Sequence, residues 1–221
     1  MSFVLPTPAD GPAPKQQRSH ATRARLVDAA VAMLVEHGLA GATTPRIASR
    51  AHVSQGALFK HFPTKDAILA AAVEAMLRGF IADFTHQLGA LPLPNLARVG
   101  DLVTPACAAL WRIFRTREMR AVFEVYVAAR TDAAIAARLA PILQGHRAMI
   151  LAEARRLFPI HRDIDDFEAA VDAIVYSMQG AALGLFAPDP DVEIEHLAFL
   201  ERLARRELGL DAPPRRPGRR S

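Results

Sequence analysis

The sequence predicts an all-α fold, and three observations lead to that prediction. Apolar residues recur at the spacing of a helix face along nearly the whole chain, and no segment alternates as a half-buried strand does. The apolar content is 51%, mostly Ala, Leu and Val, which suits helices packed on helices. Gly and Pro residues separate the periodic segments. At 221 residues the chain can form one large domain or two small ones.

The N-terminal part begins with a segment that lacks periodicity. Residues 1–18 are rich in Pro, Gly and Gln, which predicts a flexible arm. A first helix is expected over 19–36, with apolar residues on one face. Gly38 is expected to end this helix in a left-handed conformation.

Two short helices are expected next, joined by a tight turn. The first, over 44–51, has Thr44 as its expected N-cap and Pro45 at its first helical position. The second, over 54–62, has Ser54 as its expected N-cap. Helices of about two turns are not stable alone in water, so both are expected to pack on the first helix.

The larger remainder is predicted to contain six helices. Two of them contain prolines, Pro105 and Pro141, which are expected to bend them. A basic tail without regular structure is predicted over 211–221. The six helices are expected over 65–88, 95–115, 117–130, 132–157, 165–186 and 191–208.

Charge is divided along the chain. The net charge is +4, yet residues 1–65 carry +5 and residues 66–214 carry −5, with four arginines beyond them. A basic end suits a polyanionic partner, whereas solvated surface charge is the ordinary alternative.

Localisation follows from what the sequence lacks. No run of about 18 apolar residues and no signal-peptide pattern occurs. Cys107 is the one cysteine, which fits a reducing compartment. We therefore expect a cytoplasmic protein without a membrane partner.

The second short helix has one anchoring face and one outward face. Leu58 and Phe62 lie on the first, while small, polar and cationic residues lie on the second. Helix, tight turn and short capped helix form a helix-turn-helix, whose second helix enters the major groove of DNA. Gln55 can pair with adenine, and Lys60 can meet a guanine edge or a phosphate. A helical hairpin kept as plain structure is the alternative.

The run RARLVDAAVAMLVEHGLAGATTPRIASRAHVSQGALFKHFPTKDAILAAAVEAM, about residues 23–77, resembles the tetracycline-repressor (TetR) family of bacterial regulators. The resemblance implies a homodimeric transcription factor, usually a repressor that a small molecule releases from double-stranded DNA carrying a palindromic operator. It also implies a helical regulatory domain with a ligand cavity, whose last two helices form a four-helix bundle with the partner subunit.

The resemblance also assigns DNA contacts, and two positions depart from the family pattern. His52 stands where the turn usually has Gly, so it must adopt any left-handed conformation at some cost. Phe59 stands where Tyr is usual and cannot donate a hydroxyl to phosphate. The expected DNA-binding residues are Thr44, Arg46, Ser54, Gln55, Gly56, Ala57, Phe59, Lys60, His61 and Lys65.

Aromatic and polar side chains of the remainder are candidates for a ligand cavity, with ordinary core packing as the alternative. They are Trp111, Phe114, Phe123, Tyr126, Arg130, His146, Met149 and Tyr176. Two glycines one helical turn apart favour close approach of a partner helix, although a contact within the subunit uses the same pattern. The expected dimer interface comprises Phe167, Val171, Ile174, Met178, Gly180, Gly184, Leu197 and Leu200.

Acidic clusters near 161–168 and 189–196 have no metal-site spacing, and they suit helix N-termini. We expect no metal, no cofactor and no enzymatic activity. The predicted domains are an arm (1–18), a three-helix helix-turn-helix DNA-binding domain (19–64), a helical ligand-binding and dimerisation domain (65–210) and a tail (211–221). A helical protein-interaction module that keeps the hairpin without binding DNA is the alternative function.

Overall fold

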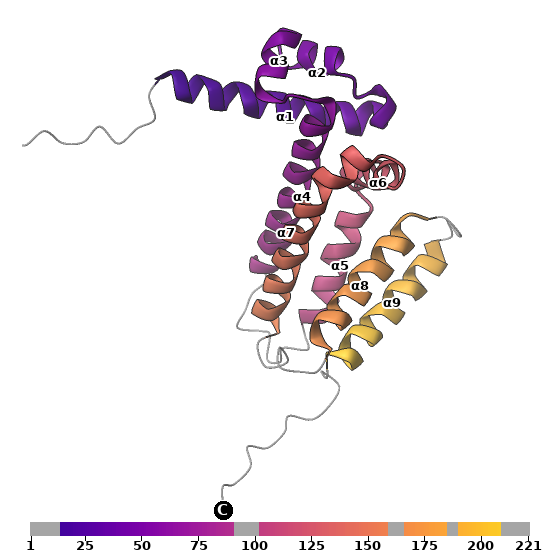
Figure 1. Cartoon of the computed structure of the whole chain (residues 1–221). Helices are drawn as coiled ribbons and strands as arrows, with labels where there is room; N and C mark the ends of the chain where they lie inside the picture. The colour runs from indigo at the N-terminus through magenta and orange to yellow at the C-terminus, as the bar shows by residue number, and fades with distance from the viewer. Residues whose placement is uncertain (1–13, 91–101, 159–165, 185–189, 209–221) are drawn as a thin grey trace, which may run out of the picture. The chain divides into compact units, whose positions relative to one another are not determined.

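The computed structural model describes residues 14–90, 102–158, 166–184 and 190–208, and these residues form helices joined by turns (Figure 1). The described residues contain no strand, which confirms the all-α prediction. The chain divides into two compact units between Ala72 and Val73. The predicted tail and residues 1–13 of the predicted arm lie outside the described residues.

The described part of the first unit contains three helices and the start of a fourth. They are α1 (Pro14–Gly41), α2 (Thr44–Arg50), α3 (Gln55–His61) and α4 (Lys65–Gly89). α2 packs on both α1 and α3 (Figure 1). The core consists of apolar side chains from all four helices, including Leu26, Leu34, Ile47, Leu58 and Ile68.

Helix α1 differs from its prediction at both ends. Gly38 has φ 66° and ψ −178°, so it interrupts the helix as predicted, although helical backbone resumes up to Gly41. At the other end, residues 14–18 are helical, so the prediction of a flexible arm is wrong for them. Lys, Gln and Arg have good helix propensity, and they prolong a helix that packing has already nucleated.

The turn between α2 and α3 agrees with the prediction. His52 has φ 55°, the left-handed conformation expected where Gly is usual. Ser54 caps α3, because its Oγ accepts the Ala57 N–H at 3.1 Å. The cap of α2 is Thr43 rather than Thr44, and the Thr43 side chain makes no capping hydrogen bond.

Within the described residues, the second unit comprises the rest of α4 and five further helices. α5 packs against α8 and α9, and α7 packs against α6 and α8. Pro105 lies in the first turn of α5, where no intrahelical donor is lost, so the bend predicted there is not needed. The helices are α5 (Val103–Phe114), α6 (Arg117–Ala129), α7 (Ala133–Leu157), α8 (Phe167–Ala182) and α9 (Pro190–Glu207).

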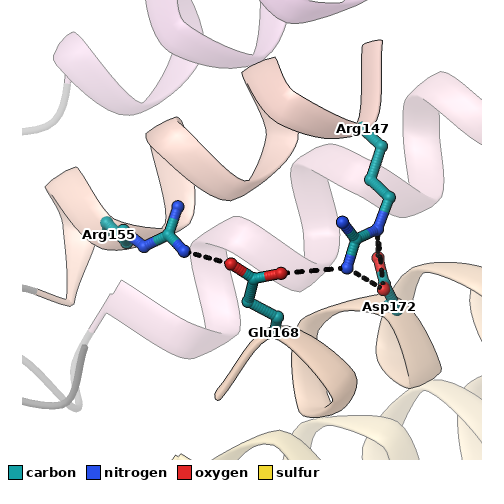
Figure 2. A network of polar contacts seen from close by, with 4 residues as sticks. All are labelled: Arg147, Arg155, Glu168 and Asp172. Atoms are coloured by element: carbon teal, nitrogen blue, oxygen red, sulfur yellow. Dashed lines mark hydrogen bonds and ion pairs between the residues drawn. The ribbon is translucent and has the colours of Figure 1, made fainter. Parts of the chain in front are cut away.

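A network of ion pairs joins α7 to α8 (Figure 2). The Arg147 guanidinium donates to Asp172 at 2.7 Å and to Glu168 at 3.1 Å, and Arg155 pairs with the other Glu168 oxygen. These hydrogen bonds raise the pKa of Arg147 and lower the pKa of Glu168.

None of the described helices is long and apolar enough to cross a membrane.

Candidate nucleic-acid interface and ligand cavity

Helix α3 buries one face and exposes the other. Leu58 and Phe62 are buried, which confirms them as the anchors of the helix. Gln55 and Lys60 are exposed, and the ring of Phe59 is 44% exposed. A polar, a cationic and an aromatic side chain therefore share the surface of one short, capped helix.

Gly56 lies in the first turn of α3, and nothing in the described structure requires it to lack a side chain. An added Cβ meets one atom within 4 Å, the Ser54 Oγ at 3.9 Å, which is an ordinary contact. Gly in a helix costs about 0.5–1 kcal/mol relative to Ala. The fold would thus be more stable with Ala, and the smallness of this position suits the close approach of another molecule. Ala57, next to it, is half-buried.

The cationic residues of α2 are held differently. Arg50 donates to both Glu36 oxygens at 2.8 and 2.7 Å and so links α2 to α1. Arg46 is exposed and donates to the Gly41 carbonyl at 3.3 Å, and it forms no ion pair with an acidic side chain of the described residues. Thr44 is half-buried beside it. Arg46 is therefore the α2 cation that can meet a phosphate, and Arg50 was not foreseen because its partner lies 14 residues away.

The end of α3 and the start of α4 carry further candidates for phosphate contact. His61 and Lys65 are half-buried, and Thr64 Oγ1 accepts the Ala67 N–H at 3.1 Å, which caps α4. The Arg23 guanidinium of α1 lies 4.9 Å from the ring centroid of Phe62. Arg23 of α1 therefore lies next to the C-terminal end of α3.

The second unit contains a largely apolar cavity of about 100 Å³. Side chains of α4, α5, α7, α8 and α9 line it, as does Met119 in the first turn of α6. Its polar exceptions are Cys107, His146 and Glu153. Burial lowers the pKa of His146, and burial with the nearby Glu201 raises the pKa of Cys107 to about 12. At neutral pH the imidazole and the thiol are therefore uncharged.

Two of the residues predicted for a ligand cavity line it, namely Phe114 and His146. Arg130 is instead exposed at the end of α6. The remaining five also lie outside the lining. The prediction placed them wrongly because helical spacing indicates an apolar face but not which helix that face meets. Those five are Trp111, Phe123, Tyr126, Met149 and Tyr176.

These five side chains have other surroundings. Phe123 and Tyr126 meet edge to face on α6, with ring centroids 6.2 Å apart. Trp111 borders a separate hollow that includes Leu197 of α9. Met149 is exposed on α7, and Tyr176 is 60% exposed on α8.

Most of the side chains predicted for the dimer interface are buried within one subunit. Four predicted side chains of α8 and Leu200 of α9 are buried in their own subunit, because the regular apolar stripe packs against α5 and α9. The outward face of α8 instead carries Tyr176, Gly180 and Leu183. A Cβ added at Gly180 meets nothing within 4 Å. The four buried α8 residues are Phe167, Val171, Ile174 and Met178.

The two glycines predicted for the interface differ, because Gly180 lies within α8 and Gly184 follows it. Gly184 follows the helix with φ 64°, the left-handed conformation that commonly ends a helix. This backbone conformation explains why a glycine stands at position 184. On α9, Ile194 and Phe199 are 67% and 55% exposed, and Leu197 is half-buried. The outward faces of α8 and α9 therefore both carry exposed apolar side chains.

No group of three or more His, Cys, Asp or Glu side chains within the described ranges is arranged to hold a metal ion. Most of the acidic segment at 161–168 lies outside those ranges. Its described acidic members are Asp166 and Glu168, and Glu168 pairs with arginines.

Comparison with known proteins agrees with this geometry. The model of bacterial regulatory proteins of the tetR family matches residues 26–72. A Mycobacterium tuberculosis protein named as an uncharacterized HTH-type transcriptional regulator is 33% identical over 86% of this chain and 95% of its own. The HTH-type transcriptional repressor KstR2 of Rhodococcus jostii is 32% identical over 48% of this chain and 50% of its own.

A solved structure shares the fold of the chain. The multidrug binding protein EbrR complexed with imidazole has a TM-score of 0.59 and 23% identity, over 82% of this chain and 93% of that chain. At this identity the likeness concerns the fold alone.

Proposed function

The chain belongs to the TetR family of bacterial regulatory proteins and is a DNA-binding transcriptional regulator, and from this premise we propose that it is a repressor. It binds a palindromic operator as a homodimer and leaves the DNA when a small molecule enters the cavity of the second unit. The repressor KstR2 among its relatives supports the direction of regulation.

One observation carries the proposal, and it is the outward face of α3. Gly56 has room for a side chain but lacks one, at a cost to helix stability, and it lies between an exposed Gln55 and an exposed Lys60. An amide that can pair with adenine, a backbone that can come close and a cation that can meet phosphate are what a major-groove helix needs. Thr44, Arg46, Phe59, His61 and Lys65 are proposed to hold the phosphate backbone, together with the N-cap Ser54.

The outward faces of α8 and α9 are proposed to form the dimer interface. Tyr176, Ile194 and Phe199 expose apolar surface there, and Gly180 allows a partner helix to approach closely. Two-fold symmetry would place the two α3 helices about 34–36 Å apart, one turn of DNA.

The test uses purified full-length protein and fragmented bacterial genomic DNA. Fragments that the protein retains are sequenced, and a single enriched palindrome is the expected result. Gln55→Ala serves as a matched variant, because it removes one base-reading side chain without disturbing the α3 core. Retention of DNA without sequence preference, equal for both proteins, would contradict operator recognition, and no retention at all would favour the protein-interaction module.

A further inference from the structure

The cavity of the second unit is small and nearly all apolar. Its volume of about 100 Å³ is of the same order as the roughly 150 Å³ apolar cavity that admits benzene. A ligand that fits it without rearrangement is therefore about one ring in size. The charge of that ligand depends on the few polar side chains in the lining.

Glu153 is the carboxylate in the lining, and its charge is already compensated. Arg156 donates to it through Nε at 2.9 Å and through Nη2 at 2.6 Å, and Thr85 Oγ1 lies 3.4 Å away. The Glu153 side chain is 14% exposed, whereas that of Arg156 is 55% exposed. A cationic ligand would have to displace this paired guanidinium while losing its own hydration, which is unfavourable in an apolar cavity.

His146 is the lining residue with an unpaired polar atom. Its Nδ1 is buried and has no hydrogen-bond partner among the residues that the structure describes, a costly state for a polar atom inside a protein. His146 lines the cavity, so a bound molecule that paired with Nδ1 would remove this cost. A hydroxyl group both donates and accepts, so it can pair with Nδ1 in either tautomer of the neutral ring.

We propose that the cavity binds a small, uncharged, mainly hydrocarbon molecule that carries a hydroxyl group, and that this hydroxyl pairs with Nδ1 of His146. The inference rests on the proposed function, because it names the class of molecule whose entry is proposed to release DNA. Glu153, already paired with Arg156, does not recognise the ligand.

Three compounds of one shape test the proposal: ethylbenzene, benzyl alcohol and benzylammonium, which end in a methyl, a hydroxyl and an ammonium group. Each is titrated into the full-length protein and followed by ligand-observed NMR. Because the compounds differ in hydrophobicity, the measured quantity is the affinity ratio of benzyl alcohol to ethylbenzene in each protein. In His146→Leu this ratio is expected to fall by about 3- to 10-fold, the worth of one hydrogen bond.

Two controls accompany the titration. His86→Leu makes the same change at an exposed site outside the lining and is expected to leave the ratio unchanged. His146→Asn keeps a hydrogen-bonding group near the position of Nδ1 and is expected to retain part of the preference. Ethylbenzene should bind His146→Leu at least as well as the unchanged protein, which shows that the cavity is intact.

Several results would overturn the proposal. They are an unchanged ratio in His146→Leu, benzylammonium binding that Glu153→Gln abolishes, or no binding of benzyl alcohol. Binding of the protein to the enriched genomic DNA fragment is measured in parallel by fluorescence anisotropy. This second measurement shows whether the ligand class or the proposed function is at fault. If the protein binds DNA but the titration gives one of these results, only the proposed ligand class is refuted. If the titration gives the expected ratios but the protein does not bind DNA, the proposed function is refuted and the ligand class is not.

Discussion

Phe59→Tyr tests whether the outward face of α3 meets DNA. The Phe59 ring is 44% exposed, so a hydroxyl at its tip can remain in solvent in the free protein. The substitution adds a hydrogen-bond donor where the TetR family usually has one and leaves the anchors Leu58 and Phe62 unchanged. The free energy of unfolding is therefore expected to stay the same.

The expected gain in DNA affinity follows from the chemistry of the new contact. A hydrogen bond to a charged group contributes about 1.5–3 kcal/mol, and less where a water molecule already bridges the gap. Without such a water molecule, this energy corresponds to an affinity gain of roughly 10- to 100-fold for each half-site. Because phosphates are the same in every sequence, the gain should be equal across operator variants.

Two measurements on the one variant decide the matter. Fluorescence anisotropy at fixed salt gives the affinity for a set of operator variants, and thermal unfolding gives the stability. Tighter binding of every variant with an unchanged melting temperature supports a phosphate-facing position 59. A lower melting temperature without tighter binding would show that the ring belongs to the core, and the reasoning would fail.

Four further predictions concern the DNA-binding face, the dimer and the α7–α8 network. Gly56→Ala should raise the free energy of unfolding by about 0.5–1 kcal/mol yet weaken DNA binding; unchanged binding would exclude close backbone approach. Gln55→Ala should cost about 1–3 kcal/mol at one base pair of each half-site, whereas Lys65→Ala should weaken all sequences alike; identical profiles across an operator library would contradict these roles. Tyr176→Arg should yield folded monomers in sedimentation, and a persistent dimer would move the interface elsewhere. Glu168→Gln should lower the melting temperature slightly at low salt and not at high salt. Since arginines lower the pKa of Glu168, its contribution is present above the ordinary glutamate pKa and is lost as pH falls through the lowered one.

The sequence alone was sufficient for the all-α class and for the helix-turn-helix, because local interactions determine these features. The Ser54 and Thr64 caps bond to N–H groups three residues away, and the left-handed turn at His52 and the break at Gly38 occur where they were predicted. The two faces of α3 follow from helical periodicity, so Leu58 was recognisable as an anchor. Residues 14–18 escaped prediction because their helix carries no apolar stripe.

Tertiary structure alone decided which partner each apolar face meets. The stripe of α8 that includes Val171 and Met178 was assigned to a partner subunit, but it packs in its own subunit and leaves Tyr176 outside. The cavity residues were mostly missed for the same reason, and Glu153 was not considered at all. Contacts such as Arg50 with Glu36 join side chains of different helices. Periodicity gives the direction of a side chain on its own helix but not the identity of the helix that it meets.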